Sequence, residues 1–266
     1  TCDSGLSVSV TRNALPQVAS VACTSGQFTY NFTASSGDGS KQIVVSQTDI
    51  AGNVGTDQRT IQVDATAPRV AITAPAANSA SVSGVTLIGT CENGLSVVVT
   101  GSGVNSATNG SCSNGAFSIP VVFSSGDGTK AVTVTQTDSA GNSGSDSRSF
   151  LRDSAAPNIA ITAPAANTEA QNGLRLQGTC ENGIVVNISG GVSQNSTATC
   201  ASGVFASDIV FSSGDGVKTI VVSQADSVGN QSSDQRNFIK DTVAPLVAIT
   251  APAANSWVRD QMTLVG

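Results

Sequence analysis

Six cysteines are the residues of this chain whose type and spacing could support chemistry. Two thiolates could hold a metal ion or form a redox pair, but no Cys-x-x-Cys spacing occurs and the chain has no histidine to complete a zinc site. We therefore expect one structural disulfide in each third of the chain, since closing a loop of about 20 residues stabilises a small domain by roughly 3 kcal/mol. Disulfides imply an oxidising location, which is periplasmic, secreted or cell-surface. The expected pairs are Cys2 with Cys23, Cys91 with Cys112, and Cys180 with Cys200.

Aspartate is the second residue type with a recurring pattern, and it accounts for most of the 18 acidic residues. Because an aspartate side chain accepts hydrogen bonds from the backbone of its own tight turn, turn formation is the simplest interpretation. Calcium is the alternative: carboxylates at a junction between domains could bind the ion and fix the angle between neighbours, although no EF-hand or nonapeptide calcium loop occurs. Its ligands would be Asp64, Asp153 and Asp241, with hairpin aspartates beside them. The other recurring positions are Asp38, Asp127 and Asp215; Asp49, Asp138 and Asp226; and Asp57, Asp146 and Asp234.

The composition argues against several classes of function. Without histidine the chain has neither a Ser-His-Asp nor a Cys-His catalytic group, so we expect no enzymatic activity and no cofactor apart from the calcium alternative. A formal net charge of −6 leaves little to neutralise phosphates, so nucleic-acid binding is not expected. No run of about 18 apolar residues occurs, so we expect no membrane insertion in this segment.

Glutamine and lysine also recur at fixed positions. The glutamines lie two residues after an apolar strand residue, so period-two alternation predicts inward side chains that bond to backbone. They are Gln47, Gln136 and Gln224. The lysines follow a Gly-Asp-Gly turn, and we expect them to be solvated, which disfavours a Lys–Asn crosslink. They are Lys41, Lys130 and Lys218.

These recurrences reflect an internal repeat of the whole chain. The segment "VAITAPAANS" begins at residue 70 and returns at 247, with "IAITAPAANT" at residue 159, a period of about 89 residues. The motifs "GTCENGL", "FSSGDGTK" and "QTDSAGNSGSDSR" recur at the same spacing. We therefore divide the sequence into a first module (1–66) that lacks its first two strands, complete second (67–155) and third (156–243) modules, and a tail (244–266) with the first two strands of a further module.

Within each module, short runs alternate apolar and polar residues between turn signals of Gly, Asn and Asp. The second module has seven such runs, and their inward positions include Val70, Leu87, Val97, Phe117 and Val132. We therefore predict an all-β fold of tandem immunoglobulin-like antiparallel β-sandwiches, each with about seven strands and one disulfide.

Two motifs connect this pattern to a family. "D-x-x-A-P-x-V-A-I-T-A-P" at the start of a module and "T-D-x-A-G-N" in its last hairpin resemble the bacterial Ig-like tandem repeats of large cell-surface adhesins and extracellular filaments. The resemblance spans the whole chain, although those repeats usually lack cysteine at these positions. It implies a structural or adhesive role, as a stiff rod or filament of Ig-like domains on or outside a bacterial cell, and it supports the calcium alternative.

Two other functions stay open at this point. The modules themselves could bind glycan or protein, although Tyr30 and Trp257, the single residues of their types, are the main aromatic anchors on offer. Alternatively, they are accessory repeats of a larger secreted enzyme. The linkers favour the rod, because each carries one proline and a second proline closes the next strand, which restricts backbone freedom. These prolines are Pro68, Pro157 and Pro245, and Pro75, Pro164 and Pro252.

The tail matches the strands that the first module lacks. Three explanations are open: the chain is a window on a longer repeat, the tail of one molecule completes the first module of the next by strand donation, or the chain is a fragment whose ends are held by packing. Under the first two, the partner is a copy of the same domains placed end to end. The inward, strand-donating positions of the tail are Val247, Ile249, Met262 and Leu264.

Overall fold

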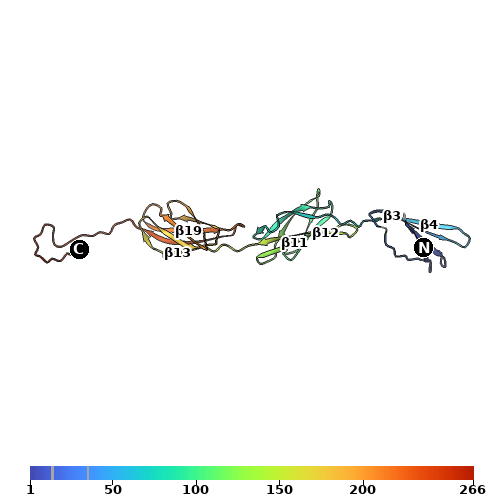
Figure 1. Ribbon diagram of the computed structural model, residues 1–266, viewed down its shortest axis with the longest axis horizontal. Helices are drawn as coiled ribbons and strands as arrows, with labels where there is room; N and C mark the ends of the chain where they lie inside the picture. The colour runs from blue at the N-terminus through green and yellow to red at the C-terminus, as the bar shows by residue number, and fades with distance from the viewer. Residues whose placement is uncertain (13–14, 35) are drawn as a thin grey trace. The chain divides into compact units, whose positions relative to one another are not determined.

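The computed structural model describes residues 1–12, 15–34 and 36–266, and within these ranges it consists of strands, turns and bends (Figure 1). In the part of the chain so described, no helix is long and apolar enough to cross a membrane. The chain forms two compact units, Thr1–Asp153 and Ser154–Gly266, and each is described by itself. The N-terminal unit contains the strands of the first and second modules, and the C-terminal unit contains those of the third module and the tail.

The second module is a β-sandwich. One sheet has the strand order β10-β7-β5 and the other has the order β6-β12-β11-β8-β9. Neighbouring strands are antiparallel, except that β6 pairs in parallel with β12. The predicted all-β sandwich class is therefore confirmed. The strands are β5 (Ala71–Ala74), β6 (Ala80–Ser81), β7 (Gly84–Thr90), β8 (Ser96–Thr100), β9 (Thr108–Ser111), β10 (Ala116–Val122), β11 (Gly128–Thr137) and β12 (Ser143–Arg152).

The complete module has eight strands where the alternation predicts seven, because the chain changes sheets after β5. Strand β5 pairs with β7 up to Ala74, which is joined to Pro75 by a cis peptide bond. The chain then crosses to the other sheet and pairs beside β12 through Ala80 and Ser81. Two residues are too few to show a period-two pattern, so the sequence gives no signal for β6.

Inward-facing residues of both sheets form the core, as the alternation predicts. Along β11, burial alternates residue by residue, with Val132 and Val134 fully buried. Phe123 and Phe150 stack with ring centroids 6.0 Å apart and close one end of the core. Burying each side chain of this size stabilises the module by about 1.5–3 kcal/mol relative to an exposed position. The remaining fully buried apolar side chains are Leu87, Val97 and Val99.

The third module repeats this architecture. Its sheets have the orders β13-β15-β18 and β14-β20-β19-β16-β17, again with one parallel pair, β14 with β20. Phe211 and Phe238 form the matching aromatic stack, with centroids 6.5 Å apart. The strands are β13 (Ala160–Ala163), β14 (Glu169–Ala170), β15 (Gly173–Thr179), β16 (Val185–Gly190), β17 (Ser196–Thr199), β18 (Val204–Val210), β19 (Gly216–Ala225) and β20 (Gln231–Lys240).

The first module contains a single four-stranded sheet with the order β2-β1-β3-β4. These strands occupy the places that β9, β8, β11 and β12 have in the second module. Val8 and Val10 on β1 are buried, but the apolar residues of β3 are only half-buried. One layer of the sandwich is therefore formed and its inner face is partly open. The strands are β1 (Ser7–Arg12), β2 (Leu15–Ala22), β3 (Gly39–Thr48) and β4 (Val54–Val63).

Candidate functional site

The cysteines pair within modules, as their spacing predicts. In the second module the disulfide joins Cys91, which follows β7, to Cys112, which follows β9, and the other two disulfides lie at the same place in the repeat, with Cα atoms 5.9–6.0 Å apart. Backbone bonds flank it in the second module, where the Cys91 N–H donates to Gly115 O at 3.0 Å and the Cys112 N–H donates to Leu95 O at 3.1 Å. No cysteine among the described residues is free. The disulfides are therefore structural crosslinks.

A glutamine bonds to the backbone of each disulfide loop, as the alternation predicts, and it is buried in the second and third modules, whereas Gln47, which bonds to Asp3 in the first module, is half-buried. Gln136 is fully buried on β11. Its Oε1 accepts a hydrogen bond from Glu92 N at 2.8 Å, and its Nε2 donates to Glu92 O at 3.1 Å. Gln224 makes the same pair of bonds to Glu181 and adds a 2.9 Å bond to Ile184 O. The amide thus satisfies backbone groups that the loop would otherwise bury without partners.

An aspartate and an arginine, two residues apart on β12, hold the first strand of the second module. The Ile72 N–H donates to a carboxylate oxygen of Asp146 at 2.8 Å. The guanidinium of Arg148 donates to Ile72 O and to Pro75 O. The third module repeats the arrangement: Ile161 N donates to Asp234 at 2.7 Å, and Arg236 donates to Ile161 O and Pro164 O. We call this pair the strand clamp.

The strand clamp is the functional element that the sequence analysis missed. The aspartates Asp57, Asp146 and Asp234 are part of the recurring set, but their partner arginines were not singled out. The signal was present, because an arginine follows each of these aspartates at the second position: Arg59, Arg148 and Arg236. In a strand this spacing places both side chains on one face, where they can reach the same neighbouring backbone.

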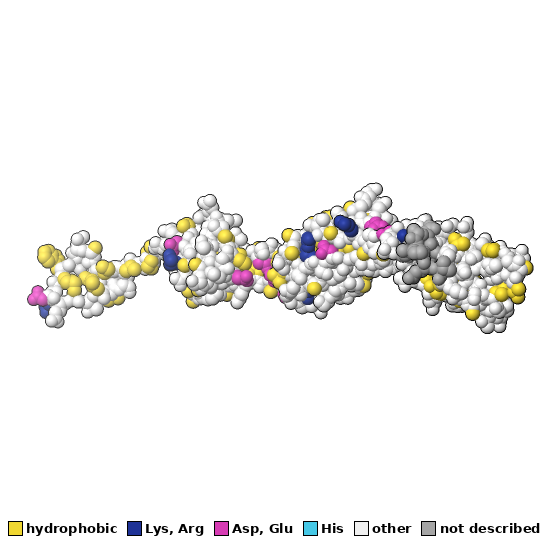
Figure 2. Space-filling model, turned by 45° about the vertical axis from the view of Figure 1, so that its right-hand side comes forward, with side chains coloured by type: hydrophobic (Ala, Val, Ile, Leu, Met, Phe, Trp, Pro, Cys, Tyr) yellow, Lys and Arg dark blue, Asp and Glu magenta, His cyan; other side chains and the backbone are white. Residues whose placement is uncertain are grey.

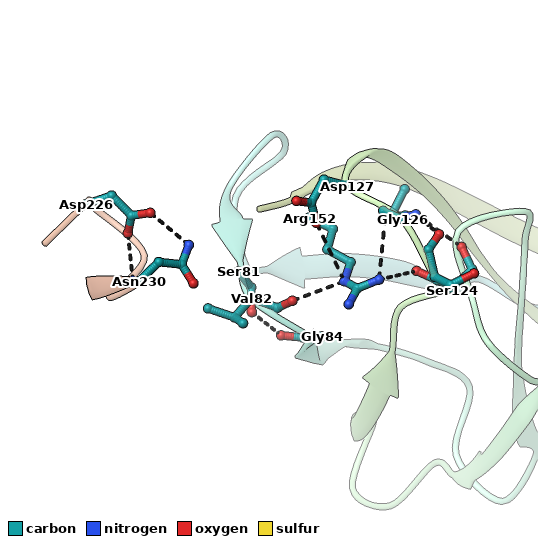
Figure 3. A network of polar contacts seen from close by, with 11 residues as sticks. Ser81, Val82, Gly84, Ser124, Gly126, Asp127, Arg152, Asp226 and Asn230 are labelled. Carbon is teal, nitrogen blue, oxygen red and sulfur yellow. Dashed lines mark hydrogen bonds and ion pairs between the residues drawn. The ribbon is translucent and has the colours of Figure 1, made fainter. Parts of the chain in front are cut away.

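The hairpin aspartates fold their own turns, as predicted. Asp138 accepts hydrogen bonds from Ala140 N and Asn142 N, each at 2.9 Å, and from the Asn142 side chain at 2.9 Å. Hydrogen bonds from the Asn142 side chain and from the turn backbone lower the pKa of Asp138, against a smaller opposing effect of burial. Bonds from Asn53 lower the pKa of Asp49 in the same way. Figure 3 shows the equivalent pair Asp226 and Asn230.

The linker aspartates, proposed as calcium ligands, bond to neighbouring backbone. Asp64 accepts a hydrogen bond from Thr66 N at 3.0 Å, and Asp241 accepts one from Val243 N at 2.9 Å. Asp64, Asp153 and Asp241 are not brought together with other acidic side chains: in the described ranges, no group of three or more His, Cys, Asp or Glu side chains could hold a metal ion. Calcium binding at these positions stays a prediction.

The expectation that the recurring lysines are solvated is wrong for two of the three. Lys130 and Lys218 are buried, at 6% and 8% exposure, and Lys41 is half-buried. The ammonium of Lys130 donates to Ser125 O at 3.0 Å and to the Ser124 hydroxyl at 3.3 Å, and Lys218 donates to Ser213 O at 2.9 Å. The aliphatic stem lies in the sandwich while its charged end reaches carbonyl groups of the preceding turn. The lysine therefore helps to fix that turn.

Arg152, at the end of the second module, binds two turns of the module together (Figure 3). Its Nε donates to Val82 O at 3.1 Å, and one Nη donates to Ser124 O at 3.2 Å and to Gly126 O at 3.5 Å. The Asp127 carboxylate lies 4.0 Å from Nε. The last residue of β12 is thus anchored to the loops beside it.

The first module presents the open half of a sandwich. Residues 27–33, the counterpart of β10, are not in a strand. Tyr30 and Phe32, whose counterparts Ile119 and Val121 are buried, are 37% and 38% exposed. A pocket of about 190 Å³ opens nearby, lined by residues that include Val8, Phe28, Val45, Gln47, Gly55 and Asp57. Among their counterparts in the second module, Asp146 accepts a hydrogen bond from Ile72 of β5 and Gly144 lies against Pro68, just before β5, so this pocket lies where a first strand would bind.

The tail contains two segments that bridge each other in the register that β5 and β7 have in the second module. Val265 forms a bridge with Ala251, and the corresponding residues of the second module, Ile88 and Ala74, also pair. The Thr250 hydroxyl donates a hydrogen bond to Val265 O at 3.1 Å, and the corresponding Thr73 hydroxyl donates to Ile88 O. Asn255 has φ +62°, like its counterpart Asn78. The segment thus has the local structure of a module start without a module around it.

The inward positions of the tail are exposed to solvent. Figure 2 shows apolar side chains gathered over this C-terminal segment. Burying four such side chains would contribute about 6–12 kcal/mol before the entropy cost of association. The exposed fractions are 83% for Val247, 68% for Ile249, 56% for Met262 and 64% for Leu264. The sequence predicts these residues to be strand donors, and the structure leaves them exposed.

No family model matches the chain, and no curated protein matches it. Among solved structures, a tetra-tandem repeat from the extending region of a large adhesion protein covers 91% of this chain and 68% of its own, at 23% identity and a TM-score of 0.37. Fibronectin(III)-like modules of Clostridium thermocellum CbhA cover 65% of this chain and 94% of their own, at 13% identity and a TM-score of 0.37.

A third solved structure, the FN1-FN3 domains of chicken CNTN1, covers 89% of each chain at 10% identity and a TM-score of 0.33. Tandem repeats of a large adhesion protein and fibronectin-like domains are thus what this chain is similar to.

Proposed function

We propose that this chain is a structural, adhesive repeat segment that works outside a bacterial cell as a stiff series of immunoglobulin-like modules. The disulfide inside each module supports an oxidising, extracellular or cell-surface location. The recurring polar side chains, Asp146, Arg148 and Gln136 among them, bind backbone groups of their own module. Their role is to hold strands and loops in place, so the proposal includes no enzymatic activity.

The observation that carries this proposal is the pairing of β6 with β12. These strands lie near the start and at the end of the second module, and they run parallel. Tension between the ends of the module pulls two parallel strands in opposite directions along their axes, so their hydrogen bonds must break together. Three backbone bonds resist this: Asn78 N to Ser149 O at 2.8 Å, Leu151 N to Ser79 O at 3.1 Å, and Asp153 N to Ser81 O at 3.1 Å.

The linkers support stiffness at the ends of modules. After the first module, the Asp38 carboxylate accepts hydrogen bonds from Ala65 N at 2.7 Å and from the Thr66 hydroxyl. After the third, Asp215 accepts bonds from Thr242 N at 3.2 Å and from its hydroxyl at 2.9 Å. The first linker residues are therefore fastened to the preceding module, and the prolines that follow restrict the chain further.

The proposal also includes end-to-end association of chains by strand complementation. The open face of the first module and the exposed strand pair of the tail are complementary in kind. An interface between one end of a chain and the opposite end of another does not close on itself, so it produces a linear filament.

Force spectroscopy on single chains tests the mechanical role. We expect Leu151→Pro to lower the unfolding force of the second module, because it removes the N–H that donates to Ser79 O. Leu151→Ala keeps that N–H and is the matched control, and the third module is an internal reference. Reduction of the disulfides should lengthen each unfolding step by about 70 Å, since an extended chain spans roughly 3.3–3.6 Å per residue. If the second module unfolded at the same force in the wild type, in Leu151→Pro and in Leu151→Ala, the result would contradict the proposal.

A further inference from the structure

We propose that Pro120 of the second module and Asp208 of the third prevent an open strand edge of each module from pairing with the same edge of a second copy of the chain. The two residues occupy one position of the repeat, on β10 and on β18, three residues after Phe117 and Phe205. One blocks the edge by a missing N–H and the other by a charge. This inference concerns lateral pairing of modules, and it does not rest on end-to-end association.

The three-stranded sheet of the second module has two edges, which differ in how their backbone groups are used. At the β5 edge, the strand clamp binds the backbone, because the N–H of Ile72 donates to Asp146 and its carbonyl accepts from Arg148. Strand β10 forms the opposite edge and has β7 as its neighbour in the sheet. Open strand edges present unpaired backbone groups to which another chain can pair. The β10 edge is therefore the one that needs protection.

The hydrogen bonds of β10 show which of its residues face the open side. In an antiparallel pair, successive residues alternate between bonding to the neighbouring strand and pointing away from it. Ala116 exchanges both backbone bonds with Ser113, at 3.0 and 3.1 Å, so its N–H and carbonyl point away from β7. Because the alternation has a period of two, Ser118, Pro120 and Val122 point to the same open side.

Two exposed residues form the unprotected part of this edge. At its far end, the carbonyl of Val122 accepts a hydrogen bond from Asn105 N at 3.0 Å, which covers that position. Outside the strand ladders, no hydrogen bond between described residues reaches the backbone of Ser118 or Pro120, and both residues are exposed. Since proline has no N–H, the only backbone donor that this stretch offers is on Ser118.

The missing N–H makes the edge a poor partner for itself. In the antiparallel register that sets Ser118 of one copy opposite residue 120 of another, both residues would exchange their backbone bonds. Pro120 has no hydrogen to donate, so half of these bonds cannot form, and its ring occupies the space that the partner's carbonyl would enter. An edge strand, with the ring nitrogen facing solvent, is the position at which a sheet accepts proline.

The third module protects the same edge with a charge. Val204 exchanges its backbone bonds with Ala201, at 3.0 and 3.2 Å, so the period of two directs the N–H of Asp208 to the open side. In the corresponding register, the Asp208 carboxylates of two copies would lie about 7–8 Å apart on one face and repel each other. The ion-pair partner Arg175 lies 3.3 Å away on β15, on the side of β18 that a second copy does not approach.

Sedimentation velocity of the whole chain tests the role of Pro120. Pro120→Thr restores the N–H with a residue that favours strands, and we expect it to raise the self-association constant at least about tenfold over the wild type. Pro120→Asp is the matched control: it restores the same N–H but adds the side chain of the third module, so it should associate no more than the wild type. Equal association of Pro120→Thr and the wild type would overturn the role of Pro120.

Asp208→Thr tests the third module independently, and we expect the same increase of at least about tenfold. Asp208→Pro is its control, because it removes the charge but also the N–H, and it should associate no more than the wild type. Each control carries a residue that the other module already holds at this position, and circular dichroism melts check that all four variants are folded. If Asp208→Thr associated no more than Asp208→Pro, the role of the charge would be overturned.

Hydrogen exchange locates the contact and separates lateral pairing from end-to-end association. In Pro120→Thr, the amides of Ser118 and of residue 120 should exchange more slowly at high protein concentration than at low concentration. The Phe117 amide, which faces β7, is the internal control and should not respond. Association of this variant with unchanged exchange at Ser118 would place the contact elsewhere and overturn the proposal.

Discussion

The backbone N–H of Ile72 lies 2.8 Å from the carboxylate of Asp146, although the two residues are 74 positions apart in the sequence. The bond joins the first strand of the second module to its last strand, across the edge of the sandwich. The same carboxylate also accepts a bond from Ser147 N at 2.9 Å, and this local bond orients the Asp146 side chain. The strand clamp thereby ties the two ends of a module together.

Asp146→Ala should destabilise the second module by about 1.5–3 kcal/mol, because the partly buried Ile72 N–H loses a charged acceptor. Chemical denaturation followed by circular dichroism measures the change. Asp208→Ala is the control, since the side chains of Asp208 and Arg175 are 77% and 59% exposed and such ion pairs contribute at most about 1 kcal/mol. Equal losses in both variants would mean that the clamp is not what stabilises the first strand.

Gln136→Leu should cost about 1–3 kcal/mol, because it leaves Glu92 N–H and two carbonyl groups of the disulfide loop without their buried partner. Hydrogen exchange should show faster exchange of the Glu92 amide than in the wild type. Gln58→Leu is a suitable control, since Gln58 lies on an exposed surface of β4. Unchanged exchange at Glu92 would argue that the loop is held by its disulfide alone.

Removal of one disulfide by Cys91→Ala with Cys112→Ala should lower the stability of the second module by about 3 kcal/mol, since the closed loop spans 21 positions. The third module should keep its own transition, because Cys180–Cys200 is untouched. Calorimetry with two resolvable transitions would show this. A loss of both transitions together would contradict independent modules.

Lowering the pH should destabilise the hairpins. The pKa of Asp138 is lowered in the folded state by hydrogen bonds from Asn142, so its charged form stabilises the fold above the ordinary value of 3.8. That contribution is lost as the pH falls through the lower folded value. Thermal melts should therefore show wild type more stable than Asp138→Asn at pH 7, with the difference in Tm shrinking below about pH 4. A difference that grows with acid would contradict the assignment.

Calcium should leave the Tm unchanged, because Asp64 and Asp241 already accept hydrogen bonds from Thr66 and Val243. Melts in millimolar calcium and in EDTA measure this directly. If Tm rises with calcium in the wild type but not in Asp64→Asn, the calcium alternative that the sequence leaves open is correct for this junction.

The sandwich was predictable because its signals are local and repeated. Alternation marks the inward positions of each strand, and it also places Gln136 in the core. The short strand β6 and the strand clamp were not predictable in the same way. Their partners lie far away in the sequence, and an arginine on β12 looks like any solvated residue until the first strand is placed beside it. Lys130 was misassigned because a long apolar stem allows a charged residue near a turn to be buried.

Every disulfide of the chain begins and ends inside one repeat. Genetic exchange between neighbouring repeats, in frame with the period, would therefore add or delete two cysteines at a time and leave no thiol unmatched. The length of such a protein could change over generations without any new requirement on its oxidative folding.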